Sequence, residues 1–447
     1  MNDTATERVY PPGPALAPAA QALQWIARPY EFLRACSAEF GDVFALNFGQ
    51  QGKYVIFSRP DALRAIFTAD ANVLHVGPGN AILEPLVGPA SLLLLEEDRH
   101  VRERRLLMPA FQPRAVAGYG TVIRDAVTAV TAGWAAGCEF DAQTVLQDIS
   151  IDVILRAVFG LGASGVWGEL KTELVALLND RRLTMGLLGR LRDEAPDPVL
   201  KSFQDRLARL RRVTRQIIAD RRAYSAGTDD VLAMLIAATD EQGRGRSDEE
   251  IGDELMTLVV TGHETTATAL AWGFYWLATN DDVAQRLRAE IHAKGSAPEF
   301  KALAQLEYLD ATCKEILRIY PIVPSVFRQV VQPFRVAGYE FEPGTVLSPS
   351  IYLTHNRPEL YPANDRFDPE RFLRRTYSPY EYLPFGGGAR RCVGMQLAIY
   401  EMKVILATIF DRYELALAKG QTVVPVRRMV AVAPSGGPRM VVTSARG

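Results

Sequence analysis

The sequence predicts a mainly α-helical fold with a minor β region. Long stretches carry apolar residues three and four positions apart, which is typical of amphipathic helices. Two shorter stretches combine β-branched and aromatic residues with Gly-containing turns, which is typical of strands. The strands do not alternate regularly with the helices, so a doubly wound parallel sheet is not indicated.

The N-terminal part of the chain predicts little helix. Residues 1–29 contain the sequence PPGP and are expected to form an extended lead-in, because proline disfavours a helix interior. Residues 42–58 predict two strands around a Gly-containing turn. Residues 335–350 predict a second strand patch, with a turn at Pro343-Gly344.

Helical periodicity dominates the rest of the chain. It is clearest in residues 152–160, 171–180, 202–224, 251–278 and from Gly394 onward. No Ser/Gly linker, charged block or fixed repeat divides residues 30–447, so we expect one domain there.

Composition limits the class of protein. With 48% hydrophobic and 23% charged residues, the chain suits a soluble globular protein with a large core. A net charge of -2 argues against nucleic acid as a partner. No apolar run is long enough for a signal peptide or a spanning helix, so we expect a cytoplasmic monomer without stable membrane insertion. The chain has four cysteines: Cys36, Cys138, Cys313 and Cys392. They are far apart in the sequence and form no CxxC pair, which disfavours both a zinc site and a disulfide framework.

The stretch LPFGGGARRCVG, residues 383–394, leaves several interpretations open. A phosphate loop would need Gly-Lys-Ser/Thr after the glycines, and a dinucleotide fingerprint would need GxGxxG after a strand. A nucleophilic cysteine or a buried structural cysteine remains possible. The position of Cys392 directly before a helix favours a stabilised thiolate, and Arg390 adds a nearby cation. A single thiolate that ligates haem iron has these requirements.

The loop F-x-x-G-x-R-x-C-x-G resembles the haem-binding loop of the cytochrome P-450 superfamily. The resemblance implies a fold with haem b (heme b, iron protoporphyrin IX) between a long central helix and a cysteine loop. It assigns Cys392 as the metal ligand. It also assigns four further loop residues to cofactor binding: Phe385, Gly386, Arg390 and Gly394.

Three more stretches match the family in its order. In KEILRIYP, the resemblance implies that Glu315 and Arg318 form a buried structural network with Arg371. In TGHETT, it implies a groove for dioxygen at Gly262, a hydrogen bond from Thr265 to bound oxygen, and proton relay by Glu264. A threonine hydroxyl in the middle of a helix can also donate to the i−4 carbonyl and open the helix locally. Thr261 stands where relatives more often have Ala or Gly, and His263 is expected to be packed or solvated.

The third stretch is EEDRHVRERRLLMPAF, in which His100 and Arg104 lie four apart on one helical face. The resemblance implies that they contact the haem propionates together with Arg328 and Arg390. Many relatives have Trp at the position of His100, and both side chains can donate a hydrogen bond.

The resemblance further implies a monooxygenase that uses dioxygen. Electrons would come from NAD(P)H only indirectly, through a separate ferredoxin or flavodoxin and its reductase, because no such domain is expected in this chain. We expect docking on the cysteine side, with positive charge from Arg102, Arg105, Arg391 and Lys403.

The substrate is expected to be a lipophilic small molecule such as a fatty acid or terpenoid. Its pocket walls are expected at Val76, Ile82, Leu83, Leu187, Leu188, Val260, Val323, Val326 and Val432, with a lid over residues 185–200. The basic helix over residues 206–222 is most simply a solvated face, with a transient membrane contact as the alternative. A haem-thiolate peroxygenase, an isomerase or dehydratase of the same fold, and a haem sensor remain rival functions.

Overall fold

The computed structural model describes residues 10–76, 78–81, 83–160, 165–178, 198–223, 230–239, 243–293, 300–303, 305–428 and 430–446. Its helices are α1 (Pro18–Ala27), α2 (Pro29–Phe40), α3 (Pro60–Phe67), α4 (Pro78–Ala81), α5 (Glu84–Val87), α6 (Glu97–Leu107), α7 (Pro113–Ala117), α8 (Gly120–Thr131), α9 (Ala142–Phe159), α10 (Gly165–Leu178), α12 (Pro198–Ala223), α13 (Val231–Ala237), α14 (Asp248–Thr279), α15 (Asp281–His292), α16 (Phe300–Leu303), α17 (Glu307–Ile319), α18 (Ile351–His355), α19 (Arg371–Arg374) and α20 (Met395–Arg412). Short 3-10 turns are η1 (Gly49–Gln51), η2 (Met108–Phe111) and η3 (Gly388–Arg390).

The strands form four small sheets. They are β1 (Val43–Asn47), β2 (Lys53–Phe57), β3 (Leu74–His75), β4 (Glu139–Asp141), β5 (Arg328–Val330), β6 (Phe334–Val336), β7 (Tyr339–Phe341), β8 (Val346–Pro349), β9 (Tyr413–Leu417), β10 (Pro425–Arg428), β11 (Ala431–Pro434) and β12 (Arg439–Ala445). The largest sheet has the order β1-β2-β8-β5-β3, and its β2–β8 pair is parallel. The other sheets are β4-β12-β9 and the hairpins β6-β7 and β10-β11. The expected class, mainly α with a minor β region, is confirmed.

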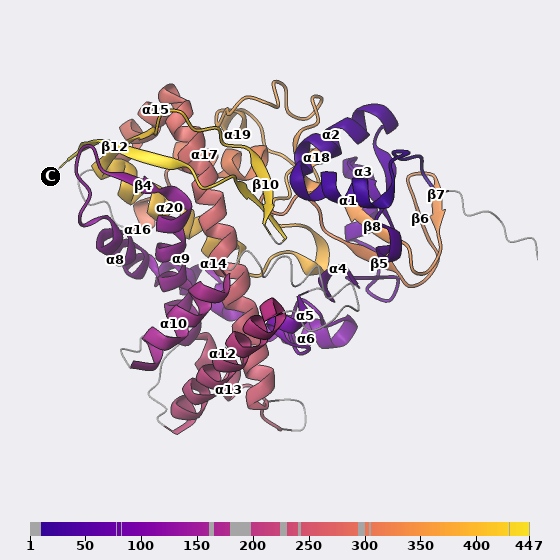
Figure 1. The fold of residues 1–447 in the computed structure, drawn as a ribbon, viewed down its shortest axis with the longest axis horizontal. Helices are drawn as coiled ribbons and strands as arrows, with labels where there is room; N and C mark the ends of the chain where they lie inside the picture. The colour runs from indigo at the N-terminus through magenta and orange to yellow at the C-terminus, as the bar shows by residue number, and fades with distance from the viewer. Residues whose placement is uncertain are drawn as a thin grey trace, which may run out of the picture.

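The helices and the largest sheet occupy different ends of the molecule. In Figure 1, α14 runs through the centre beside α9 and α20, and β5 and β8 of the largest sheet lie with α1 to α3 at the other end. A core of buried apolar side chains fills the helical part, and a smaller one lies around the sheet. None of the helices in the described part of the chain is long and apolar enough to cross a membrane.

The longest helix, α14, begins where the sequence provides a strong start signal. Ser247 accepts a hydrogen bond from the Glu250 N–H, and the Glu250 carboxylate accepts one from the Ser247 N–H. This capping box fixes the N-terminus, because it satisfies backbone donors that a helix start leaves without partners. The periodic apolar residues of α14 then pack against α9.

The prediction of an extended lead-in over residues 1–29 is wrong for residues 18–27. Residues 18–27 form α1, which Pro18 begins at a position where a missing N–H costs nothing. The Ala, Gln and Leu residues that follow are good helix formers, and they outweigh the proline content upstream. Residues before α1 are extended: Pro12 accepts a hydrogen bond from the Ala45 N–H at 2.9 Å, beside β1.

Both predicted strand patches are confirmed, and so is the turn at Pro343-Gly344, where the Thr345 N–H donates to the Glu342 carbonyl at 3.2 Å; the sequence does not predict a second turn. The predicted turn at Pro343-Gly344 leads from β7 into β8. The second, tight turn joins β6 to β7 at Ala337 and Gly338, whose φ angles are 53° and 84°. A turn with two positive φ angles matches the twist of a two-stranded hairpin, which explains its position.

Two predictions concern the region between residues 185 and 222. The lid over residues 185–200 lies outside the described residues except for its last three, which begin α12; Ile82, Leu187 and Leu188 are also outside them. In α12 several arginines are paired with acids of α10: Arg206 and Arg209 with Glu173, and Arg212 with Glu169. These ion pairs support the expected solvated face rather than a membrane contact.

Candidate active site

The cysteine loop is a tight turn that delivers Cys392 to the N-terminus of α20. The Cys392 N–H donates to the Phe385 carbonyl at 3.0 Å, which closes the loop. Gly388, at φ +66°, lies so close to α3 that a Cβ there would clash with the Phe67 carbonyl oxygen. This close approach explains why the loop needs glycine at that position.

The sulfur of Cys392 is buried, which favours the neutral thiol, but nearby donors and cations favour the thiolate. The first residue of α20 follows Gly394, which provides no side-chain cap, so the backbone N–H groups of Gly394 and Met395 are left to donate to the thiol. Burial raises the pKa of Cys392, while these N–H groups and Arg104 lower it. The residue nevertheless has exposed surface.

Three of the four predicted propionate contacts surround this loop with positive charge, and the fourth is neutral. Burial lowers the pKa of His100 to about 4, and Arg390, Arg104 and Arg328 contribute to this lowering, so this imidazole is neutral near pH 7. Burial also lowers the pKa of Arg328, to about 10. We call His100, Arg104, Arg328 and Arg390 the cation cluster.

Glu96, which the sequence did not single out, lies within this group. Its carboxylate forms an ion pair with Arg390 and raises the pKa of Arg328 against the effect of burial. No spacing or motif predicts it, because its partners are distant in the sequence. The Nη1 atom of Arg390 is buried and has no hydrogen-bond partner among the described residues.

These residues fit the haem that the resemblance implies. A buried guanidinium nitrogen without a described partner is a donor suited to a carboxylate, and haem b has two propionates. Gly386 and Gly394 have open space where a Cβ would be, which would let a flat ring approach the backbone. The donors are one thiolate and several cations, which is the set a haem-thiolate site requires.

Thr265 and Glu264 lie on the central turns of α14. The Thr265 hydroxyl donates to the Thr261 carbonyl at 2.7 Å, as expected for a mid-helix threonine, but α14 continues without a break through this point. Burial raises the pKa of Glu264, and Arg428 of β10 lowers it. The carboxylate accepts a hydrogen bond from Gln147 of α9 at 2.6 Å and is 3.2 Å from Nε of Arg428.

Gly262 allows α14 to pack closely against α9. A Cβ on Gly262 would lie 2.7 Å from Cδ1 of Ile154 in α9, so that side of the glycine is filled by helix packing and is not an open groove. His263 is packed as expected: it is buried, and burial lowers its pKa to about 3.

The buried network around Glu315 is confirmed. Its carboxylate accepts from Arg318 Nε at 2.7 Å and from Arg371 Nε at 3.2 Å, and Arg318 is fully buried. Arg318 also donates to the His355 carbonyl at 3.0 Å, and the ring of His355 accepts from the Leu383 N–H at 2.9 Å. The network therefore reaches the first residue of the cysteine loop.

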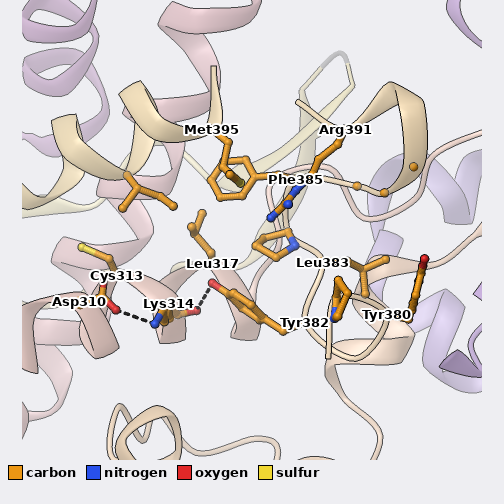
Figure 2. A pocket seen from close by; sticks show the side chains of 16 residues that line it. Asp310, Cys313, Lys314, Leu317, Tyr380, Tyr382, Leu383, Phe385, Arg391 and Met395 are labelled. Atoms are coloured by element: carbon orange, nitrogen blue, oxygen red, sulfur yellow. Dashed lines mark hydrogen bonds and ion pairs between the residues drawn. The ribbon is translucent and has the colours of Figure 1, made fainter. Parts of the chain in front are cut away.

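A pocket of about 440 Å³ lies on one side of the cysteine loop. Figure 2 shows Lys314 of α17 paired with Asp310 and the Tyr382 hydroxyl bonded to the Lys314 carbonyl, with the nitrogens of Arg391 directed among the lining residues. Neither Cys392 nor any residue of the cation cluster lines this pocket.

Two other predicted residues are placed differently. Lys403 is buried and paired with Asp310 at 2.5 Å, so it is not a surface cation for docking. Val432 is fully buried, and its carbonyl accepts from Trp272 Nε1 at 3.1 Å, so it is a core residue and not a pocket wall. Both errors arise because periodicity alone does not show which face of an element is covered.

Comparisons with known proteins identify relatives along nearly the whole chain. The sequence model of the family described as "Cytochrome P-450" matches residues 11–439. A Mycobacterium tuberculosis protein provisionally named cytochrome P-450 135B1 is 36% identical, over 98% of this chain and 92% of its own length. Another from the same organism, provisionally named cytochrome P-450 135A1, is 32% identical over 96% of this chain and 94% of its own. The solved structure of a retinoic acid bound cyanobacterial protein, CYP120A1, superimposes with a TM-score of 0.85 at 26% identity, covering 98% of this chain and 99% of that one.

Proposed function

The chain belongs to the cytochrome P-450 family of haem-thiolate monooxygenases, and from this premise we propose that it oxidises a lipophilic small molecule of the fatty acid or terpenoid class. One observation carries the site assignment: the Cys392 thiol, two helix N–H donors and the cation cluster meet at one loop. In this proposal Cys392 is the axial ligand, and the cation cluster holds the propionates.

Bound haem would supply the activation of dioxygen, with the thiolate ligand favouring O–O cleavage. The protein's own residues then hold the ligand and its loop in place. The N–H groups of Gly394 and Met395 stabilise negative charge on the sulfur of Cys392 against the effect of burial, and a bound iron would remove the remaining proton. The Arg318–His355–Leu383 chain of hydrogen bonds fixes the start of the loop.

Thr265 and Glu264 are proposed to deliver protons. The Thr265 hydroxyl donates to Thr261, which leaves its oxygen free to accept a further hydrogen bond. The raised pKa of Glu264 brings this carboxyl closer to the pH at which it can both bind and release a proton. An acid and an alcohol in adjacent positions favour the monooxygenase over the peroxygenase and the sensor.

Three buried or nearly buried apolar residues support a lipophilic substrate. Val76 and Leu83 precede α6, and Val260 lies on α14; the resemblance places both segments around the substrate, and none of the three residues offers a polar group. The similar cyanobacterial structure binds retinoic acid, an apolar terpenoid acid, which supports the same class.

Electron delivery is proposed to occur on the cysteine side, from a separate ferredoxin or flavodoxin with its NAD(P)H-dependent reductase. Arg102, Arg105 and Arg391 are exposed cations that suit an acidic partner. Arg391 also borders the pocket of Figure 2, so a partner docked there would contact the loop that carries Cys392.

The decisive experiment compares haem-loaded wild type with Cys392→Ser and, as a matched control, Cys138→Ser. After reduction under carbon monoxide, wild type and C138S should give the long-wavelength Soret band of thiolate ligation, and C392S should lack it. A wild type without this band contradicts the assignment. Turnover of lipids and terpenoids with a surrogate ferredoxin and reductase, but not with peroxide alone, would separate the monooxygenase from the peroxygenase.

A further inference from the structure

Glu96 connects two parts of the molecule that the proposed function treats separately. It is the residue directly before α6, and its carboxylate uses both oxygens. One oxygen pairs with Arg390, two residues before Cys392. The other accepts the Val76 N–H at 2.9 Å, at the end of β3 and the start of a proposed substrate wall.

The charge of Glu96 also matters to the whole cation cluster. Arg104, Arg328 and Arg390 carry three positive charges, His100 is neutral near pH 7, and Glu96 contributes one negative charge. Three guanidiniums and one carboxylate leave a net charge of +2 in this group. Two ionised haem propionates carry the opposite charge, so the group and the propionates together would be neutral.

Burial makes this balance important. Arg328 is 8% exposed, and the side chain of Arg390 is 15% exposed. Charges in such surroundings interact more strongly than charges in water, because little solvent screens them. One surplus charge at this place would therefore change the electrostatic potential at a bound iron.

We propose that Glu96 is a positioning residue that sets the net charge at the haem propionates, orients Arg390 toward them, and ties this edge of the haem to the substrate wall at Val76. The inference rests on the proposed haem site. It predicts that Glu96 lowers the reduction potential of the iron, because a negative charge nearby disfavours the gain of an electron.

The test compares Glu96→Gln with Glu97→Gln in the haem-loaded protein. The first substitution would keep the side-chain shape and an acceptor for the Val76 N–H but remove the charge. Glu97 is the adjacent carboxylate; its side chain is 52% exposed and it pairs with His75, so E97Q is a matched loss of charge away from the cluster. The ferric/ferrous midpoint potential, measured by spectroelectrochemistry, should rise in E96Q and stay at the wild-type value in E97Q.

Equal potentials in E96Q and E97Q would overturn the charge role of Glu96. The link to Val76 is tested by hydrogen exchange: Glu96→Ala, which removes the acceptor, should speed exchange of the Val76 amide, and E96Q should not. Unchanged exchange in E96A would overturn the link, and if E96A does not fold the E96Q potential still decides the charge role. A further outcome is that the wild-type protein shows the thiolate Soret band while E96Q has the wild-type midpoint potential. That result would refute this inference and leave the proposed function intact.

Discussion

Thr265 is the single side chain whose loss should separate electron use from product formation. If its hydroxyl helps to deliver protons, Thr265→Ala should lower product formation roughly 10²-fold while cofactor consumption continues. The ratio of product formed to NAD(P)H consumed measures this effect.

Thr279→Ala is the control for this substitution. Thr279 lies on the same helix and makes the same kind of bond, to the Tyr275 carbonyl at 2.9 Å, but at the exposed end of α14. A T265A enzyme with the coupling ratio of T279A would exclude a role for Thr265 in proton delivery.

Glu315 should be the residue with the largest effect on stability. Glu315→Gln leaves Arg318 and Arg371 buried beside a neutral group, and breaking such a network costs about 3–5 kcal/mol. Urea unfolding would measure the loss. Glu340→Gln, which breaks a surface pair with the 80% exposed Arg335, should leave the free energy of unfolding close to the wild-type value, because solvent screens this pair.

At the scale of single residues, the sequence predicts the roles of those residues that belong to local motifs. Glu315 and Arg318 are three apart on one helix, and Cys392 lies just before another, so they belong to short stretches whose resemblance to a known family implies their roles. Glu96 and Gln147 act through partners that are far apart in the sequence, and only the folded chain brings them together.

At the scale of elements, α14 holds the loop that follows α5 through two adjacent carboxylates. Asp253 accepts the Ala90 N–H at 3.1 Å, and Glu254 accepts the Leu92 N–H at 2.9 Å. Glu254 is 1% exposed, and burial raises its pKa from 4.5 to about 7, so the protonated form is favoured in the folded protein. Arg246 lowers this pKa and Asp253 raises it.

This contact should make stability depend on pH. Because the folded pKa lies above the unfolded one, the contribution of Glu254 is fully present below pH 4.5 and is lost as the pH rises through about 7. Glu254→Gln should remove this part of the dependence, so the free energy of unfolding of E254Q minus that of wild type should increase between about pH 5 and pH 8. The exposed Glu249→Gln should show no such trend, and a flat difference for E254Q would contradict the assignment.

Elements with strong periodicity or clear caps can be predicted from sequence. The central helix and both strand patches belong to this group, because a long apolar repeat or a turn residue determines them locally. The helix α1 does not, because the proline-rich residues before it suggest an extended chain, whereas Pro18 begins the helix. The close contact between Gly262 and Ile154 cannot be predicted from the sequence either, since it depends on where α9 packs against α14.

The whole molecule should present one face to its electron donor. Arg102 and Arg391 are exposed, and charge reversal of both to Glu should slow electron delivery at low salt and flatten its salt dependence, because favourable attraction is lost. Stopped-flow reduction by a surrogate ferredoxin at several ionic strengths measures this.

Arg335→Glu is the control for docking, since it reverses an exposed charge in the β6–β7 hairpin at the sheet end of the molecule (Figure 1). If R335E slows reduction as much as reversal at Arg102 and Arg391, the donor does not recognise the cysteine side.

The cation cluster should affect the lifetime of the protein in a cell before haem is bound. Its guanidiniums repel one another inside the fold, and a bound dianion relieves that repulsion only in the native state, so ligation favours folding by mass action. A newly made chain should therefore depend on the supply of porphyrin and iron, and under iron starvation proteases should clear it faster than transcript levels would suggest.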